Sequence, residues 1–294
     1  MRYEGKGLKV DEVVEAGPFD KVSSKVAPGT VIEKIDGVEI GPDTDWFELL
    51  NGKAGKPVLF SLFNPQTKER WEEIAKPVSK GKMNNLLYDR WVKSRAAEVE
   101  RLSGGRLGYV HLKSMNDGSY RDIYSDILGK YNLKDGIVID TRYNGGGRLH
   151  EDIEILFSGE KYLEQVIRGT VACDMPSRRY NKQSIMLVCE ANYSNAHGTP
   201  WVYRHKKMGS IVGMPVPGTM TSVNWETLQD ASMYFGIPVI GYRTKEGTYL
   251  ENSQLEPDFK VRNIYNETEK GRDAQLEKAV EELLRQIDAN PDRW

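Results

Sequence analysis

Apolar and polar positions change their spacing along the chain, and the first 80 residues form the simplest part of this pattern. Apolar runs of strand length, such as 31–35 and 58–63, are separated by turn-forming pairs. Asp36-Gly37 lies between two such runs, as in a tight hairpin. Residues 45–50, which follow Pro42, have the composition of a short helix. Residues 1–80 are therefore predicted to form a small β-rich domain.

From residue 106 onward, short apolar runs alternate with amphipathic segments. Gly136-Ile137-Val138-Ile139-Asp140 is continuous enough to be a strand that is buried on both faces. Helices of about ten residues between such strands imply crossover connections and a layered α/β core. The predicted strands are 107–112, 136–140, 185–188 and 210–213, and the predicted helices are 120–131, 151–157, 200–208 and 273–290.

The segment 81–105 differs from both neighbours, because a helical pattern runs through it and stops at Ser103-Gly104-Gly105. It predicts a helical linker. The expected organisation is therefore a β-rich domain over 1–80, a linker over 81–105 and an α/β core over 106–294.

The composition and the motifs of the chain argue against several classes of function. The chain has 41 Lys and Arg against 43 Asp and Glu, a balance that argues against a general nucleic-acid binder. No apolar run approaches the roughly 18 residues of a membrane span. The N-terminus lacks the apolar stretch of a signal peptide. Cys173 and Cys189 lie outside any structural-zinc pattern. They are expected to be free thiols, with a single disulfide as the alternative.

Candidate chemistry lies first in Asp140-Thr141-Arg142-Tyr143-Asn144-Gly145-Gly146-Gly147, which follows the most apolar predicted strand. Ligands of open α/β sheets bind beyond the carboxyl ends of the strands. Glycines there let backbone N–H groups approach a phosphate or the oxyanion of an acyl-transfer intermediate. The Lys and Ser/Thr of a phosphate-binding loop are absent, and a flexible turn is the plain alternative.

Two further segments carry polar groups that could act with this loop. Tyr193-Ser194-Asn195-Ala196-His197-Gly198 lies between a predicted strand and a predicted helix, where nucleophilic serines occur, although Ser194 taken alone is more typical of a helix cap. Glu251, in a later loop, could orient a base, or it could be a solvated carboxylate. His150 could line the same cleft. His111 reads as a core residue and His205 as a solvated one, while Trp46, Trp201 and Trp225 are expected to fill cores.

Together these segments resemble the tail-specific proteases of peptidase family S41, which include C-terminal processing proteases and the core of tricorn protease. The glycine loop is similar to the family's Asp-x-Arg-x-Asn-x-Gly-Gly loop, and Leu250-Glu251-Asn252 through Pro257-Asp258 is similar to its ending. The resemblance implies a mixed α/β fold, with a PDZ-like, peptide-binding domain over 1–80 and a layered core like those of ClpP and crotonase over 106–294.

The resemblance also assigns roles. It implies an oxyanion hole built from the N–H groups of Gly145, Gly146 and His197, with Asn144, Gly147 and His150 against the substrate and Glu251 as the supporting carboxylate. Matching the family's Ser-x-Ser-Asp-Gly turn to residues 194–198 places the nucleophile at Ala196, which has no hydroxyl. The family's histidine precedes the PDZ domain, and the lysine of the processing proteases has no counterpart in residues 217–221.

Three explanations fit this departure. A serine at 196 has been replaced by design, or the protein is a natural homologue that is inactive or uses Ser194, or the turn is shifted relative to the match. We therefore expect a serine peptidase core that cleaves peptides or unfolded protein segments by acyl transfer but is inactive as this chain, because loss of the nucleophile costs orders of magnitude in rate. The alternatives are a non-catalytic peptide-binding scaffold and, less in keeping with the motifs, a nucleotide-binding protein.

The same resemblance implies no metal and no organic cofactor. The expected partner is a peptide or unfolded protein, with no nucleic acid and no membrane span, and formation of a homo-oligomer is compatible with the sequence. An extracytoplasmic location such as the periplasm is expected in preference to the cytoplasm.

Overall fold

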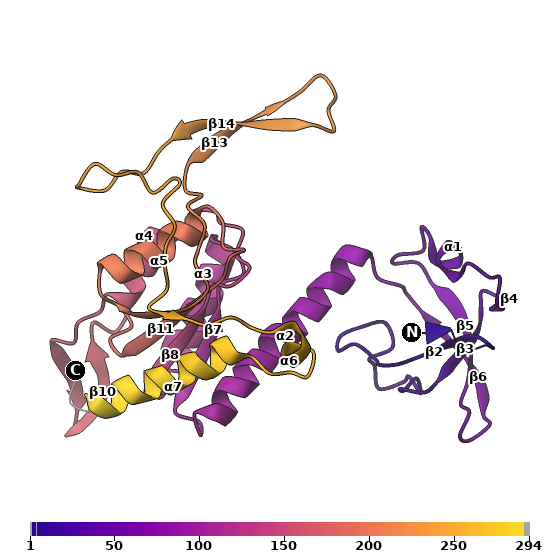
Figure 1. Cartoon of the computed structure of the whole chain (residues 1–294). Helices are drawn as coiled ribbons and strands as arrows, with labels where there is room; N and C mark the ends of the chain where they lie inside the picture. Colours follow the sequence, from indigo (N-terminus) through magenta and orange to yellow (C-terminus); the bar gives the residue numbers. More distant parts are fainter. Residues whose placement is uncertain (1, 4, 291–294) are drawn as a thin grey trace. The chain divides into compact units, whose positions relative to one another are not determined.

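The computed structural model describes residues 2–3 and 5–290, and it divides the chain into two compact units, Met1–Ser94 and Arg95–Trp294. Helix α2 (Lys80–Leu102) begins in the first unit and ends in the second (Figure 1). It is the helix predicted over 81–105, and it ends one residue before Ser103-Gly104-Gly105, as expected where glycines stop a helix.

The first unit is built on one antiparallel sheet. Its strands lie in the order β1 (Arg2–Tyr3), β2 (Leu8–Lys9), β3 (Val31–Ile35), β5 (Val58–Phe63) and β6 (Arg70–Ala75), and β4 (Val38–Glu39) pairs with β3 through the Asp36-Gly37 hairpin. Alternate residues of the strands, such as Ile32, Phe60 and Leu62, fill the core. Helix α1 (Trp46–Leu50) is capped by the Asp45 side chain, which accepts a hydrogen bond from the Phe47 N–H.

The second unit has a parallel five-stranded sheet, as the alternation of strands and helices predicts. Its order is β15 (Phe259–Lys260), β12 (Gly209–Gly213), β11 (Gln183–Val188), β8 (Gly136–Asp140) and β7 (Leu107–His111). Every residue of β8 is buried, because helices cover both of its faces.

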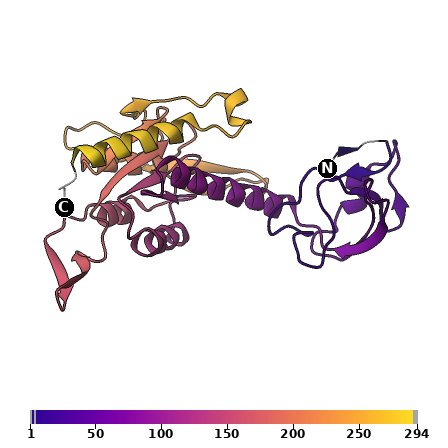
Figure 2. The same cartoon turned by 90° about the horizontal axis from the view of Figure 1, so that it is seen from below.

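The helices of this unit form two layers, one on each side of the sheet (Figure 2). Ile123 and Ile153 pack with Ile137 and Ile139 in one core cluster. On the opposite face α7 packs closely on β8, since a Cβ added at Gly136 would lie 2.9 Å from Ile287 Cδ1 and 3.2 Å from Leu283 Cδ2. The first layer contains α3 (Asp117–Ser125), the π-helical turn η1 (Asp126–Lys130), α4 (His150–Phe157) and α5 (Asn195–His205), and the second contains α7 (Ala274–Ala289).

Helix α5 begins at Asn195, five residues before its predicted start, and Pro200 lies inside it. Proline is favoured in the first turn of a helix, which suggested a start at 200. Because Pro200 has no N–H, the Ala196 carbonyl is left without its usual helical donor. The Asn192 side-chain amide donates to that carbonyl at 3.2 Å instead. A local side-chain hydrogen bond from the turn before the helix therefore permits the longer helix.

Two hairpins were not predicted from the sequence. They are β9 (Leu163–Ile167) with β10 (Thr170–Met175), and β13 (Ser222–Thr227) with β14 (Tyr234–Ile240). Their apolar side chains are exposed, and they do not show the alternation of apolar and polar residues that marks a strand facing a core. Trp225, expected to be buried, is 62% exposed in β13. Cys173 and Cys189 are free thiols. The remaining element is the short helix α6 (Tyr265–Thr268).

Candidate functional site

The loops that follow β7, β8 and β11 meet at the carboxyl edge of the parallel sheet, and Asn144 ties them together. Its side-chain NH2 donates to the Leu112 carbonyl at 2.7 Å, and its side-chain oxygen accepts from the Gly146 N–H at 2.8 Å. Its backbone carbonyl accepts from the Tyr193 N–H at 3.0 Å. Asn144 is fully buried, so it shapes the loop from within and does not lie open to a substrate.

Ser194 occupies the sharp turn between β11 and α5. Its backbone angles are φ 55° and ψ −123°, a region that an L-residue enters only under strain. Ser194 stands at the cap position of α5, but its side chain makes no capping hydrogen bond. The simple reading of this serine as a helix cap is therefore not borne out, and its half-buried hydroxyl remains available.

The triglycine loop packs directly against this turn. Gly146 has φ 94°, and a Cβ added to it would lie 2.7 Å from the Ser194 Cβ and 2.7 Å from the Tyr193 carbonyl oxygen. Gly145, by contrast, has open space around it. The glycine at 146 is thus required for close approach of the two loops, whereas the one at 145 leaves room beside the backbone.

The backbone donors at this junction differ from those expected. The N–H of Gly146 is used by Asn144, and the N–H of His197 donates to the Ser194 carbonyl at 2.8 Å. Among the described residues, the N–H groups of Gly145 and Asn195 meet no acceptor. The pair of free donors next to Ser194 is therefore Gly145 with Asn195, and the prediction of Gly146 and His197 is corrected. Gly147 lies at a backbone bridge with Met115.

Ala196 lies in the hydrophobic core of the second unit, with none of its surface exposed. A hydroxyl at this position would face packed apolar side chains and could not reach a substrate. This burial contradicts the assignment of the nucleophile position to Ala196. Of the explanations given above, a homologue that uses Ser194 and a turn shifted relative to the match both agree with this burial.

Glu251 lies close enough to His197 for the two groups to interact electrostatically. One oxygen of Glu251 accepts hydrogen bonds from the backbone N–H groups of Met220 and Thr221, at 2.8 Å and 2.6 Å. Burial acts to raise the pKa of Glu251, but these hydrogen bonds outweigh burial and hold the pKa below its usual value. The group is thus a carboxylate near neutral pH, and it is anchored by backbone.

His197 is buried, and in the described part of the chain neither of its ring nitrogens has a hydrogen-bond partner. Burial lowers its pKa, and the charge of Glu251 offsets only part of that effect. The ring is therefore neutral at pH 7. An orphaned polar ring is costly inside a protein, which marks His197 for a role beyond packing.

His150, the first residue of α4, is held in one tautomer by the residue after Ser194. The side-chain oxygen of Asn195 accepts from the N–H groups of Leu149 and His150, so its NH2 group faces the His150 ring, with 2.7 Å between Nδ2 and Nδ1. An amide NH2 only donates, so Nδ1 accepts and the proton of neutral His150 is on Nε2. His150 presents an N–H donor at the site.

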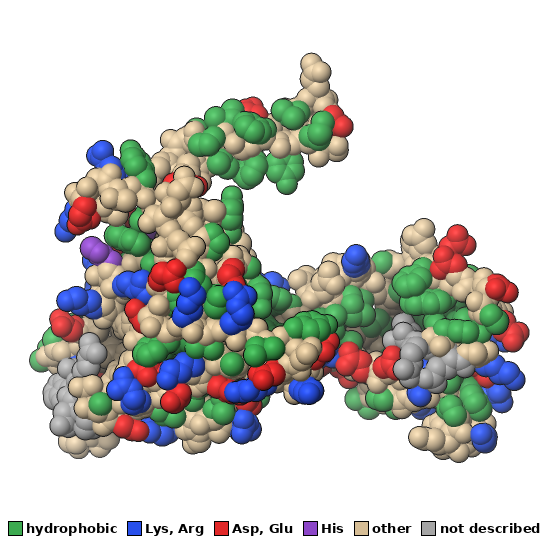
Figure 3. All heavy atoms as spheres, viewed as in Figure 1, with side chains coloured by type: hydrophobic (Ala, Val, Ile, Leu, Met, Phe, Trp, Pro, Cys, Tyr) green, Lys and Arg blue, Asp and Glu red, His purple; other side chains and the backbone are tan. Residues whose placement is uncertain are grey.

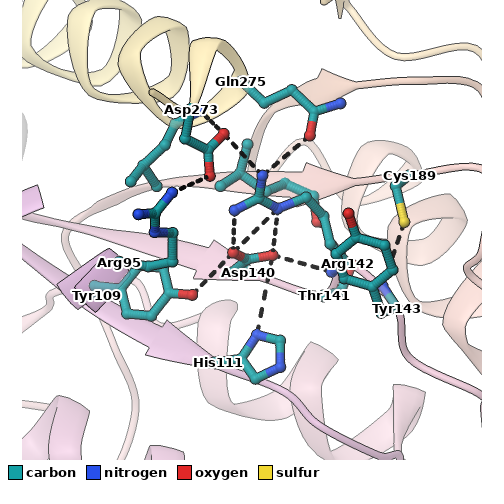
Figure 4. Close-up of polar contacts among 12 residues, drawn as sticks. Arg95, Tyr109, His111, Asp140, Thr141, Arg142, Tyr143, Cys189, Asp273 and Gln275 are labelled. Carbon is teal, nitrogen blue, oxygen red and sulfur yellow. Dashed lines mark hydrogen bonds and ion pairs between the residues drawn. The ribbon is translucent and has the colours of Figure 1, made fainter. Parts of the chain in front are cut away.

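A buried network of charges supports the glycine loop from below (Figure 4). Asp140, at the end of β8, binds the Arg142 guanidinium, and Arg142 in turn donates to Asp273 at 2.9 Å, at the start of α7. Asp273 also pairs with Arg95 at 3.2 Å. Burial acts to raise the pKa of Asp273, but its ion pair with Arg142 dominates and lowers it to about 2. Sequence analysis included Asp140 and Arg142 in a motif and placed Asp273 at the start of the last helix, but it did not indicate that these residues meet.

His111 lies beside this network, 4.0 Å from Asp140, and its side chain is only 3% exposed, as predicted for a core histidine. Across the described ranges 2–3 and 5–290, no three His, Cys, Asp or Glu side chains gather as a metal site would require. None of the helices in those ranges is long and apolar enough to span a membrane.

Comparison with known proteins finds relatives among the tricorn proteases. The chain is 26% identical over 308 residues to tricorn protease homolog 1 of Streptomyces coelicolor, and the match covers 99% of this chain and 28% of that protein. It is 24% identical over 293 residues to the tricorn protease of Thermoplasma volcanium, with 93% and 26% covered. The chain thus spans about a quarter of the length of these curated relatives.

A crystal structure of the tricorn protease superposes on 94% of this chain and 28% of its own, with a TM-score of 0.78 and 20% sequence identity, a likeness of fold. The model of peptidase family S41 matches residues 106–261, which is more than half of the chain and contains the glycine loop, Ser194 and Glu251. The chain belongs to peptidase family S41.

Proposed function

We propose that the second unit is a serine peptidase core in which Ser194 attacks the peptide carbonyl. The observation that carries the proposal is the strained backbone of Ser194, whose side chain caps nothing although it begins a helix. Strain of this kind persists where function needs a side chain displayed in one direction. In the acyl-transfer step, Oγ bonds to the carbonyl carbon, its proton passes to a base, and the amine leaves with a proton.

The oxyanion of the intermediate would be held by the N–H groups of Asn195 and Gly145. Both are free donors in the described structure: Asn195 follows Ser194 at the start of α5, and Gly145 precedes Gly146, which packs against Ser194. Fixed donors of this kind stabilise the developing charge without reorganising, and removal of one costs about 100-fold to 1,000-fold in rate. The His150 Nε2–H would add a donor to the bound peptide.

Two groups could take the serine proton. The resemblance to the family points to a histidine upstream of the first unit, oriented by Glu251. Within this chain, His197 is the alternative, because its neutral ring feels the Glu251 charge and its two nitrogens are uncommitted. Ser194 immediately precedes α5 and His197 is the third residue of that helix, so the two residues belong to one turn of the backbone, in which the His197 N–H donates to the Ser194 carbonyl at 2.8 Å.

The first unit would deliver the substrate as a PDZ-like domain does. Its core opens into an apolar pocket of about 200 Å³, whose lining includes Val10, Phe19, Ile32, Leu50 and Phe60. Such a pocket would take the apolar side chain of an extended peptide end. The test is binding of a labelled apolar peptide to the full chain. Phe19→Ala should weaken binding about tenfold, and equal affinity for both forms would contradict the assignment.

The decisive test of the peptidase is covalent labelling by a fluorophosphonate, followed by peptide mapping and a cleavage assay on unfolded protein. We expect the label on Ser194, none in Ser194→Ala, and unchanged labelling in Ala196→Ser, whose new hydroxyl would be buried. Each form is measured with and without the natural upstream segment. If every form binds peptide but none is labelled and none cleaves protein, the peptidase proposal is wrong and the protein is a peptide-binding scaffold.

A further inference from the structure

A pocket of about 400 Å³ in the second unit lies beside the turn that carries Ser194. One wall is a face of α5, along which His197, Trp201, Arg204 and His205 follow the spacing of a single helix face. The other wall is the segment 253–256, which comes directly after the loop of Glu251. Because His197 is bonded to Ser194 through the backbone, the pocket is a groove that begins at the reactive turn and runs along α5.

Both walls of this groove are held in place by contacts within the unit. Leu255 and Val216 form a backbone bridge, in which the N–H of each donates to the carbonyl of the other, at 3.0 Å and 2.9 Å. On the helix side, the Trp201 ring stacks on His205, with 4.8 Å between the ring centroids. The groove is therefore formed before a ligand binds, and it offers an aromatic wall.

Two side chains that line the groove have buried polar atoms without partners. Among the described residues, neither ring nitrogen of His197 has a hydrogen-bond partner, and neither does Nε of Arg204. Both hydrogen bonds of the Arg204 guanidinium come from Nη2, which donates to the Glu256 carbonyl at 2.5 Å and to Asp258 at 3.0 Å. A buried donor without an acceptor is costly, so the groove is suited to a ligand that supplies acceptors.

The guanidinium of Arg204 determines which acceptor fits best. Guanidinium groups bind carboxylates through charge-assisted hydrogen bonds, which are about twice as strong as those between neutral groups. The existing ion pair with Asp258 is weak, because the Asp258 side chain is 41% exposed and also accepts from the Ile211 N–H. Glu256, the acidic residue of the groove, is held by Lys260. Arg204 therefore keeps donors for a further carboxylate.

Long-range charge does not select this ligand. Lys and Arg side chains are interspersed with Asp and Glu on the face of the second unit that Figure 3 shows. Fields of opposite sign largely cancel over such a surface, and salt screens what remains. Selection must therefore come from direct contact with Arg204.

We propose that this groove is a specificity site for an acidic side chain of the bound peptide, whose carboxylate Arg204 holds while its methylene groups pack on Trp201. This proposal rests on the peptidase function proposed above. Seven residues of α5 separate His197 from Arg204, which is about 10 Å along the helix axis. An extended peptide covers that distance with about three residues. The acidic residue is therefore expected about three residues from the bond that Ser194 cleaves.

The test measures equilibrium binding of labelled peptides to the full chain with Ser194→Ala, so that no cleavage intervenes. The peptides are amidated at the carboxyl terminus and carry Glu or Gln at one position, which is moved along the sequence. At one position we expect Glu to bind about tenfold or more tighter than Gln. Arg204→Ala should reduce that ratio to below about threefold, and Arg204→Glu should favour Lys at the same position.

Two controls isolate the groove. Arg272→Ala removes an exposed arginine that is paired with Glu267 outside the groove, and it should keep the preference for Glu. Of the described residues that line the pocket of the first unit, none is Lys or Arg, so binding there gives no preference for Glu. Circular dichroism verifies that each variant keeps its fold.

Equal affinities for Glu and Gln at every position would overturn the proposal, as would a preference that both Arg204 variants leave unchanged. A Gln peptide with a free carboxyl terminus that binds as tightly as the best Glu peptide would assign the groove to a chain end and overturn the acidic side chain. Fluorophosphonate labelling of the chain with Ser194 intact tests the peptidase separately. A preference for Glu without labelling would support the groove and contradict the peptidase, and labelling without that preference would do the reverse.

Discussion

At the scale of single residues, the site depends on which polar groups have hydrogen-bond partners within the protein and which do not. Asn144 and Asn195 commit their side chains to backbone and to His150, so they organise the loops. Ser194, the N–H of Asn195 and the N–H of Gly145 remain available. These available groups lie around one turn, which is why the proposal places the reactive serine there.

The tautomer of His150 gives a prediction that depends on one atom. Asn195→Asp keeps an oxygen for the N–H groups of Leu149 and His150 but replaces the NH2 group by an acceptor. His150 should then carry its proton on Nδ1, and Nε2 should accept instead of donating. Nitrogen NMR of the histidine ring reports the tautomer directly. An unchanged Nε2–H signal in the variant would show that Asn195 does not set it.

For His197, the prediction concerns pH. A base must be deprotonated to accept a proton, and burial holds the pKa of His197 below its usual value of about 6.5. If His197 is the base, activity should rise with pH through a pKa below that value and level off at neutral pH. His197→Gln should remove this limb and lower kcat about 100-fold or more. A retained limb would assign the base to another group.

At the scale of elements, the close packing of the glycine loop against the start of α5 should tolerate a methyl group at one glycine and not at its neighbour. Gly146→Ala places Cβ 2.7 Å from Ser194 and requires a positive φ, whereas Gly145→Ala meets open space. Strain of this kind costs about 1–3 kcal/mol. We expect Gly146→Ala to lower kcat/KM by about tenfold to 100-fold and Gly145→Ala by less than threefold. Equal losses in both variants would contradict the packing.

At the scale of the whole molecule, Asp273 connects the end of the sheet to the last helix across more than 100 residues of sequence. Its pKa is about 2 in the folded protein and about 3.9 in an unfolded chain. A depressed pKa adds stability above the unfolded value, and that stability is lost as pH falls through the folded value. Wild type should lose about 2 kcal/mol of unfolding free energy between pH 4 and pH 2 from this group.

Asp273→Asn should abolish that acid-dependent step and, by leaving Arg142 and Arg95 without their carboxylate, cost about 3–5 kcal/mol at pH 7. Urea unfolding at pH 7, 4 and 2.5 measures both effects. Asp117→Asn removes an exposed carboxylate paired with Arg121 and serves as the control, with a change below about 1 kcal/mol. A variant that kept the wild-type pH dependence would show that Asp273 is not its source.

The sequence by itself determined the parts of this protein whose signals are local and periodic. The continuous apolar run at 136–140 coincides with β8. A strand buried on both faces is apolar at successive positions, so its ends lie where the apolar run stops. The order of strands and helices gave the parallel sheet of the second unit, and the Asp36-Gly37 pair gave its hairpin in the first. The motifs also gave the family, since they combine residues that one fold brings together.

The tertiary structure decided the rest, because it depends on contacts that sequence spacing does not encode. Whether Ser194 or Ala196 is accessible depends on the sharp turn before α5 and on the core that buries Ala196. Which N–H groups are free depends on where Asn144 and Asn195 find partners in other loops. The link between Arg142 and Asp273 joins residues with no local relation. Hydrogen-bond partners and burial are properties of the assembled fold.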